Sequence, residues 1–303
     1  MKELKEIRDD QIRIVGEGGV NKSPFRLNVW VIALSVLGIV IIGVIILLST
    51  KHTEEEAEVL EAPEPALFEP VTIPEPVKPH WIGKEVDSLT TGFTEILDTL
   101  VNDIPIRIFI PHNAEMSLHI GRMDKSDKSI VYTAQAADVR ADNGGIVGAF
   151  VLKGKALAWG LSKKGFCASI NGKITVGVAD NTSLFDDAIA NEGHFFRQYP
   201  LVKDGQVVEN ALKGKSIRRA ICDRQGEIFM VETGTIESLH DFAQALADMG
   251  VNQSVYLVGS SAYGWAVDEN GKTHEFGEDN YYRGRRMMPQ NTSYIVWRNR
   301  KSD

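Results

Sequence analysis

The apolar residues of this chain follow two different patterns. From Leu27 to Thr50 they form one run in which no residue carries a formal charge and most are Val, Ile or Leu. At about 1.5 Å per residue, a helix of this run is about 36 Å long and can cross a hydrocarbon core of about 30 Å. Trp30 stands near one end, where an interfacial indole is typical. The run therefore predicts a single transmembrane helix over residues 27–50.

The basic residues around this run predict its orientation. Six Lys or Arg side chains precede it, whereas Lys51 is followed by no basic residue until Lys78. Flanks rich in Lys and Arg stay on the cytoplasmic side of a membrane. We therefore expect residues 1–26 to be a cytoplasmic segment of a single-pass membrane protein. The C-terminal bulk is expected outside the cytoplasm, in the cell envelope.

Residues 51–80 have the composition of a linker. They hold six of the eleven prolines and eight glutamates. Proline and the mutual repulsion of like charges keep such a segment extended, and it has too little apolar surface to fold alone. It is predicted to be an acidic, Pro-rich stalk. The folded domain is expected over residues 81–303, beginning at Trp81.

Beyond the stalk, short apolar or alternating runs are separated by Gly, Asn and Asp. A helical apolar stripe predicts a helix over Ser88–Val101. A second helix is expected to begin after Ser238, with Asp241 in the place of a capping-box acid, and to end at Gly250. The other runs are typical of strands, and they cover residues 106–110, 129–139, 146–152, 255–258, 262–267, 272–276 and 293–298.

Three turn sequences predict hairpins. Asn171-Gly172 separates two strand-like runs by two residues that tolerate a positive φ. Asp204-Gly205 does the same between residues 200–202 and 206–208. Gln225-Gly226 does so between residues 218–222 and 227–233. With many hairpins and few helices, the domain is predicted to be α+β, a mainly antiparallel sheet flanked by helices.

Charge and composition exclude several classes of function. The 303 residues carry 33 Lys+Arg and 41 Asp+Glu, a formal net charge of −8. Residues 1–80 hold 8 of the basic and 13 of the acidic side chains, so the net charge of residues 81–303 is only −3. A hydrophobic fraction of 43% excludes a disordered chain. An acidic chain is also a poor ligand for nucleic acid, and no nucleic-acid partner is expected.

Familiar cofactor and metal motifs are absent from the sequence. There is no G-x-G-x-x-G, Walker A or G-x-S-x-G motif, and the seven histidines lack zinc-ligand spacing. No metal site or cofactor is predicted, although a requirement for a divalent cation stays open. Cys167 and Cys222 both lie in strand-like runs, and a disulfide and two buried thiols are both open for them.

Four short polar or glycine-containing segments stand at the ends of predicted elements. Each alone is typical of a turn, but together they form an ordered series along the chain. The segments are Asn191-Glu192-Gly193-His194 before Phe195, Arg218-Arg219 at the start of a hairpin, Gly259-Ser260-Ser261 after a strand, and Pro289-Gln290-Asn291 before the last strand.

In this order the segments resemble the phosphodiester glycosidase domain family, over roughly Gly148 to Arg298, about half of the chain. The resemblance implies an α+β domain whose turns converge on one cleft for a carbohydrate phosphate. Asn191 and Gly193 look like the family's Asn-Gly-Gly-x-Phe turn, and Arg218 or Arg219 looks like its hairpin arginine. Gly259 and Ser261 look like part of its Leu-Asp-Gly-Gly-x-Ser strand end, and Asn291 matches its late Pro-x-Asn.

The resemblance also suggests roles for these residues. Arg218 and Arg219 would hold phosphate oxygens, since guanidinium groups bind them bidentately. Asn191, Ser260 and Asn291 would position the sugar. Three departures stand out: Val258 replaces the family's Asp, Ser260 replaces a Gly, and Glu192 replaces a Gly in the first motif.

Two functions follow from this comparison. The first is a membrane-anchored extracytoplasmic hydrolase that cleaves a glycosyl phosphodiester. Glycoside cleavage commonly needs two carboxyl groups, and with Val258 in place of Asp the candidate catalytic residues are Glu192 and His194. The second is a non-catalytic sugar-phosphate-binding or envelope scaffold domain that has lost the catalytic acid.

Aromatic residues add one further possibility. Trp159, Trp265 and Trp297 are able to stack on sugar rings, but packing in the core is the favoured interpretation for all three. Tyr281–Arg286 combines two Tyr with three Arg. This segment is expected to be an exposed loop that lines the cleft.

Overall fold

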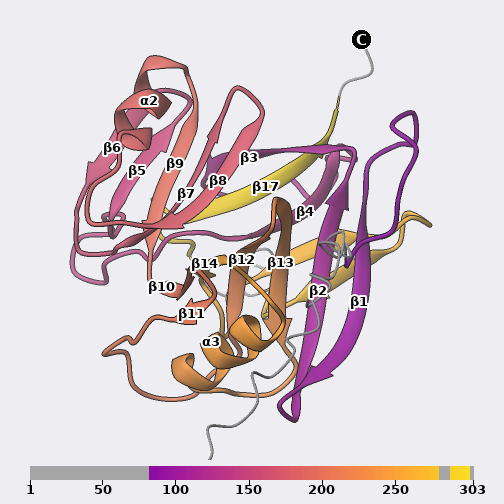
Figure 1. The fold of residues 1–303 in the computed structure, drawn as a ribbon. Coiled ribbons are helices and arrows are strands. Elements are labelled where there is room, and N and C mark those ends of the chain that lie inside the picture. The colour runs from indigo at the N-terminus through magenta and orange to yellow at the C-terminus, as the bar shows by residue number, and fades with distance from the viewer. Residues whose placement is uncertain (1–81, 280–286, 301–303) are drawn as a thin grey trace, which may run out of the picture. The chain divides into compact units, whose positions relative to one another are not determined.

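The computed structural model of this chain describes residues 82–279 and 287–300, and in these ranges it contains seventeen strands and two helices (Figure 1). All of them belong to one structural unit, Pro74–Asp303. The elements are β1 (Phe93–Val101), β2 (Ile104–His112), β3 (Ala114–Ile120), β4 (Ile130–Gln135), β5 (Ala149–Leu152), β6 (Lys155–Trp159), β7 (Gly165–Ile170), β8 (Lys173–Val178), α2 (Leu184–Ala190), β9 (His194–Gln198), β10 (Pro200–Lys203), β11 (Gln206–Val207), β12 (Arg219–Arg224), β13 (Glu227–Thr233), α3 (Leu239–Asp248), β14 (Gln253–Leu257), β15 (Gly264–Val267), β16 (Thr273–Phe276) and β17 (Ser293–Asn299).

The described strands form three sheets. The first has seven strands in the order β1-β2-β13-β12-β14-β10-β11. The other two have five strands each, in the orders β16-β15-β4-β17-β3 and β6-β5-β9-β7-β8. Every strand pair within them is antiparallel, which confirms the predicted antiparallel pairing. The described strands form three sheets rather than the one sheet predicted, and only two short helices accompany them.

One hydrophobic core joins the three sheets. Phe109 and Ile221 come from the first sheet, Ile295 from the second, and Phe150 and Phe196 from the third, and all five are buried in the same cluster. Such shared burial fixes the sheets against one another, because each covers an apolar face of its neighbours. The two helices are peripheral: α2 packs on β5, β7 and β9, and α3 packs on β10 and β11.

The predicted turns and the predicted second helix are confirmed. Asn171 and Gly172 have φ values of 51° and 75° and connect β7 to β8. The Asp204-Gly205 and Gln225-Gly226 turns connect β10 to β11 and β12 to β13. Helix α3 begins after Ser238, whose hydroxyl accepts the N–H of Asp241 at 3.0 Å. Short-range turn and capping chemistry decides these features, so they are readable from the sequence.

The predicted helix over Ser88–Val101 is wrong. The segment ends in strand β1, which pairs residue by residue with β2 from Phe93↔His112 to Val101↔Ile104. The turn between the strands is Asn102-Asp103, with φ values of 51° and 63°. This two-residue turn sets a nine-residue ladder, and the ladder overrides the helical spacing of the apolar side chains. Leu100, a member of that stripe, is 63% exposed.

Several elements are not predicted from the sequence. The main ones are β3, β6, β9 and the helix α2. Helix α2 is only seven residues long and its N-cap residue, Ser183, makes no side-chain capping bond. Such a short helix depends on packing against a sheet rather than on its own propensity, and the sequence pattern alone does not reveal that packing.

The membrane predictions concern residues outside the described ranges. The cytoplasmic segment 1–26, the transmembrane helix 27–50 and the stalk 51–80 all lie there, as does Tyr281–Arg286. Within residues 82–279 and 287–300, neither helix has the length and apolar character needed to span a bilayer.

Both cysteines are free thiols in the core. Cys167 lies 3.9 Å from the Met116 sulfur, and Cys222 lies 3.3 Å from the Ser254 hydroxyl. Burial raises the pKa of both thiols, that of Cys222 to about 12, so both stay protonated and unreactive near neutral pH. The sequence leaves open a disulfide or two buried thiols, and the structure contains the two buried thiols. In the described part of the chain no group of three or more His, Cys, Asp or Glu side chains is placed to hold a metal ion.

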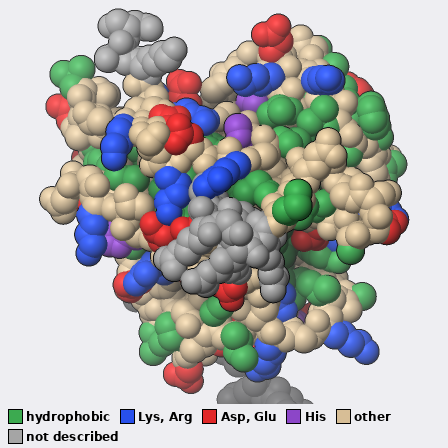
Figure 2. All heavy atoms as spheres, turned by 180° about the vertical axis from the view of Figure 1, so that it is seen from behind, with side chains coloured by type: hydrophobic (Ala, Val, Ile, Leu, Met, Phe, Trp, Pro, Cys, Tyr) green, Lys and Arg blue, Asp and Glu red, His purple; other side chains and the backbone are tan. Residues whose placement is uncertain are grey.

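Charged side chains of both signs are distributed over the surface. On the face seen in Figure 2, the Lys and Arg side chains of the described residues are interspersed with Asp and Glu. Some of these charges are paired, for example Arg107 with Asp98 at 2.7 Å and Arg140 with Asp142 at 2.8 Å. Exposed pairs of this kind contribute little to stability.

Candidate functional site

Five segments that are distant in the sequence surround one groove of about 940 Å³. They are the β2–β3 connection, the β7–β8 hairpin, the α2–β9 turn, the β12–β13 turn and the end of β17. We call it the asparagine groove, because four asparagines line it. Its lining residues are Pro111, Asn113, Ala114, Glu115, Met116, Ser117, Ser169, Asn171, Gly172, Ile174, Asn191, Glu192, Gly193, His194, Gly226, Ile228, Trp297, Arg298, Asn299 and Arg300.

One of the four predicted segments lies in this groove. Asn191 is the C-cap residue of α2, and its side-chain amide donates to the Asp187 carbonyl at 2.8 Å. Glu192 follows with a φ of 51° and an exposed side chain. Gly193 is buried, and a Cβ there would lie 2.9 Å from the Ser169 carbonyl oxygen. The turn therefore packs tightly against β7 and presents the two residues before Gly193 at the rim.

His194 is the first residue of β9 and is buried. Its Nδ1 accepts the N–H of Lys153 at 3.4 Å. Burial, together with the nearby charge of Lys153, lowers the pKa of His194 to about 4. The imidazole is therefore neutral near pH 7. A neutral imidazole is a poor general acid, but it can still donate or accept a hydrogen bond.

Two residues of the lining also carry buried polar atoms without a partner. The indole N–H of Trp297 and the amide oxygen of Asn299 make no hydrogen bond with the described residues. Buried polar atoms are nearly always paired with protein, water or a ligand. Both atoms are covered by protein, so a ligand in the groove contacts them only after a local rearrangement.

Two arginines supply positive charge at the end of β17. Arg298 donates to the Ser117 hydroxyl at 3.2 Å and lies 3.5 Å from an Asp127 oxygen. Arg300 is 65% exposed at its side chain and lies 3.9 Å from a Glu115 oxygen. At that separation the Arg300–Glu115 pair is loose, and Arg300 can turn toward an anion in the groove.

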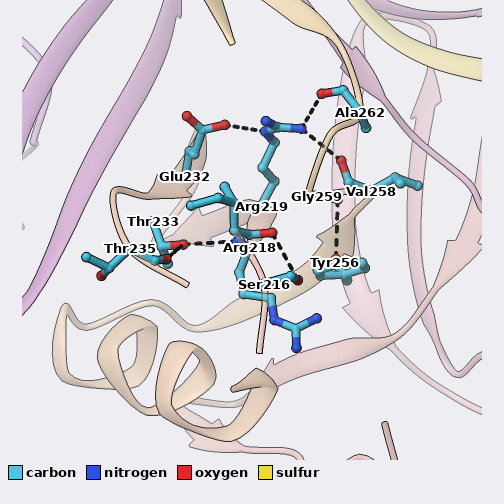
Figure 3. A network of polar contacts seen from close by, with 11 residues as sticks. Ser216, Arg218, Arg219, Glu232, Thr233, Thr235, Tyr256, Val258, Gly259 and Ala262 are labelled. Atoms are coloured by element: carbon cyan, nitrogen blue, oxygen red, sulfur yellow. Dashed lines mark hydrogen bonds and ion pairs between the residues drawn. The ribbon is translucent and has the colours of Figure 1, made fainter. Parts of the chain in front are cut away.

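Arg219 is part of a buried polar network instead (Figure 3). It is 1% exposed and forms an ion pair with Glu232, its cross-strand neighbour. The guanidinium also donates to the carbonyls of Val258 and Ala262, at 3.2 and 2.6 Å, and its Cζ lies 4.6 Å from the centre of the Phe276 ring. These contacts hold the turn after β14 in place.

Arg218 has a similar internal role. It is 4% exposed, and its guanidinium donates to the carbonyls of Glu237 and Gly214, at 2.8 and 2.6 Å. Its own backbone N–H donates to the Thr233 hydroxyl at 3.0 Å. The side chain thus connects the two loops that flank the β12–β13 hairpin. Both arginines direct several of their donors to the protein itself.

The glycine–serine turn is also shaped by local contacts. A Cβ on Gly259 would lie 2.2 Å from the Ile217 carbonyl oxygen, so only glycine fits. The N–H of Gly259 donates to the Tyr256 hydroxyl at 3.2 Å, and the N–H of Ser260 donates to the Ile217 carbonyl at 2.8 Å. Neither amide is therefore available to an anion. The side chains of Ser260 and Ser261 are exposed.

The structure divides the predicted residues between two places. Arg219 begins β12, whereas Gly226, just after that strand, lines the asparagine groove. At about 3.3 Å per residue, β12 separates its two ends by about 16 Å. Asn291 lies at the Arg219 end of β12. The N–H of Val258, whose carbonyl accepts a bond from Arg219, donates to the Gln135 carbonyl, and the N–H of the next residue, Ala136, donates to the carbonyl of Ser293, two residues after Asn291. Asn291 itself donates to the Gly144 carbonyl at 2.7 Å.

The predicted site residues therefore form two groups at opposite ends of β12. The groove end holds Asn191, Glu192, Gly193 and His194. The other end holds Arg218, Arg219, Gly259, Ser260, Ser261 and Asn291. The turns do not converge on a single cleft.

Sequence reasoning misses most of the groove. The sequence presents Asn171 only as a turn residue, and it does not single out Ser117, Arg298 or Arg300. The one available signal is the alternation in Trp297–Arg300, which places the two arginines on the same side of the last strand. Nothing in the sequence indicates that this strand end meets the α2–β9 turn.

The network of Arg219 predicts a loss of stability on mutation. Arg219→Met should lower the free energy of unfolding by about 3–5 kcal/mol, because Glu232 is left without its cation. Combining it with Glu232→Leu should recover a large part of that loss. Urea unfolding of the full chain measures both. An Arg219→Met variant of unchanged stability that no longer bound ligand would instead support a role in binding.

The buried imidazole predicts a dependence of stability on pH. The pKa of His194 is about 4 in the folded chain and roughly 6.5 when unfolded. Between these values the unfolded state binds more protons, so stability falls as the pH falls from about 6.5 to about 4. His194→Asn keeps an acceptor for Lys153 and removes this titration. Between pH 7.5 and 4.5 the variant should lose about 2 kcal/mol less stability than the wild type; equal losses would contradict the assignment.

Comparisons with known proteins give limited similarity. No protein-family model matches the chain, and no curated protein sequence matches it. Among solved structures, the chain is similar to the zebrafish N-acetylglucosamine-1-phosphodiester alpha-N-acetylglucosaminidase catalytic domain, auto-inhibited by its pro-peptide. The TM-score is 0.48 and the identity 14%, over 69% of this chain and 83% of that chain. A hypothetical protein from Synechocystis is similar at a TM-score of 0.47 and 11% identity, over 69% of this chain and 62% of that chain. At these values the function must be argued from the residues of the chain itself.

Proposed function

We propose that this domain binds a glycosyl phosphate in the asparagine groove and does not hydrolyse it. The observation that carries the proposal is the lining: four asparagines and two serines stand beside two arginines at the end of β17. The amide nitrogens of Asn113 and Asn191 already donate to backbone carbonyls, so these two residues would offer their amide oxygens. Amide oxygens and hydroxyl groups match the hydroxyls of a sugar, and guanidinium groups match a phosphate. A volume of about 940 Å³ is within the range of ligand sites.

The contacts of the other predicted residues favour binding over hydrolysis. Arg218 and Arg219 are engaged by protein acceptors at the opposite end of β12. His194, with a pKa of about 4, is neutral near pH 7 and so lacks the proton of a general acid. The position that resembles the family's Asp is Val258.

Hydrolysis is the second candidate function, and one observation favours it. Glu115 and Glu192 both line the groove, and a pair of carboxyl groups is what glycoside cleavage requires. In that case Glu192 would act as acid or nucleophile on a glycosyl phosphodiester. The two candidates share the ligand and differ only in turnover.

The location of this function is part of the proposal. Residues 27–50 would anchor the protein in the membrane, and residues 51–80 would hold the domain away from it, outside the cytoplasm. The ligand would then belong to the cell envelope. This part rests on the apolar run and the distribution of Lys and Arg in the sequence.

Calorimetric titration of the full chain with N-acetylglucosamine-1-phosphate tests the binding. Arg300→Met should weaken binding about tenfold, since it removes a charge-assisted contact. It should change the affinity for N-acetylglucosamine, which has no phosphate, far less. Arg140→Met is the matched control, because Arg140 is also exposed and paired with a nearby acid but lies outside the groove.

Turnover distinguishes the two candidates. The full chain should release no N-acetylglucosamine from its methyl 1-phosphodiester. Release that Glu192→Gln abolishes would establish hydrolysis instead. A wild-type chain that neither binds the sugar phosphate nor cleaves the diester would contradict both.

A further inference from the structure

One tryptophan of the described residues departs from the expected core packing. Trp265 and Trp297 are buried, at 3% and 4% exposed, as the sequence favours. Trp159, the last residue of β6, is 66% exposed, and Leu161 beside it is 64% exposed. Two large apolar side chains exposed only two residues apart offer a ligand apolar surface to cover.

Trp159 lies at the edge of a hollow of about 430 Å³ that differs from the asparagine groove. Phe185, from the first turn of α2, adds a second aromatic side chain to the lining. The polar members are mostly uncharged: Asn181, Thr182 and Ser183 stand there with one carboxylate, Asp186. An apolar surface with a few hydrogen-bonding groups at its edge is the usual form of a small-molecule site.

The hollow is held in shape by a buried arginine. Arg197, 2% exposed, donates to the carbonyls of Lys163, Ala179 and Asp180, at 2.8, 2.8 and 3.0 Å. These bonds fix the segment that leads into Asn181. They also direct the guanidinium toward the protein's own oxygens, so the cation is not offered to a phosphate.

Two glycines complete this support. A Cβ on Gly148 would lie 3.1 Å from the Cβ of Arg197, and a Cβ on Gly160 would lie 3.3 Å from the Cα of Gly148. The chain beside Trp159 is therefore packed closely on Arg197. A site ordered before its ligand arrives loses less conformational entropy on binding.

We propose that the Trp159 hollow binds an uncharged sugar unit. The indole face would stack on the C–H face of a pyranose ring, and Asn181 and Asp186 would bond its hydroxyls. A phosphate is disfavoured, because the one cation of the hollow, Arg197, is engaged by backbone carbonyls. A sugar is favoured over a protein partner, because the polar groups line the same small hollow as the indole.

This site is distinct from the asparagine groove. Phe185 and Asp186 lie in the first turn of α2, whereas Asn191 caps its other end. The helix separates the two places by about 10 Å along its axis. The inference does not depend on the proposed sugar-phosphate site, and each can fail while the other holds.

Titration of the full chain with two uncharged trisaccharides, chitotriose and maltotriose, tests the inference. At least one should bind with a dissociation constant on the order of 1 mM and change the tryptophan fluorescence. Trp159→Ala should weaken that binding by about tenfold or more, and Trp159→Phe should keep part of it. Because the indole is 66% exposed, the melting temperature of Trp159→Ala should stay close to that of the wild type.

One control variant shows whether the loss of binding is specific to Trp159. Ile236→Ala removes another exposed apolar side chain, 63% exposed, and should leave trisaccharide binding unchanged. The inference is overturned if neither trisaccharide binds, or if Trp159→Ala binds as the wild type does. A wild-type dimer that Trp159→Ala converts to a monomer, without sugar binding, would overturn it in favour of self-association.

Discussion

The buried ion pair between Arg219 and Glu232 stands at the junction of the first two sheets and constrains what can surround it. A guanidinium at 1% exposure is tolerated only with a counter-ion and with acceptors for its remaining donors. Glu232 supplies the charge, and the carbonyls of Val258 and Ala262 supply two acceptors. Glu232 lies in β13, whereas Val258 and Ala262 both lie in the connection from β14 to β15. One side chain thus ties the seven-stranded sheet to the segment that leads into its neighbour.

Aromatic packing reinforces the same junction. The Phe276 ring beneath Arg219 lies 5.5 Å from Phe109 and 5.9 Å from Tyr132, measured between ring centres. Phe109 belongs to the first sheet, and the other two rings belong to the second. The two sheets close over this cluster at the Arg219 end of β12. At its other end, the turns of several hairpins meet around the polar asparagine groove.

The features that the sequence predicts are those with local causes. Asn171-Gly172 and the Ser238 cap are decided within a few residues, and both are as expected. The sequence of β1 predicts a helix, and that prediction is wrong because pairing with β2 outweighs the spacing of its apolar residues.

For the candidate site, the sequence reveals the Asn191–His194 turn but not the role of Arg219. The burial of Arg219 depends on Glu232, thirteen residues away on the paired strand, and on carbonyls about forty residues away. The exposure of Trp159 likewise follows from its place at the end of an edge strand, β6.

The central claim is that ligand is bound at the groove end of β12 and that the arginines at the other end are structural. A crystal structure of the chain with N-acetylglucosamine-1-phosphate tests it most directly. We expect the sugar against Asn191 and Asn299, the phosphate within hydrogen-bonding distance of Arg300, and the Arg219–Glu232 pair intact. A ligand against Ser260 and Asn291, with Arg219 released from Glu232 to hold the phosphate, would contradict this account.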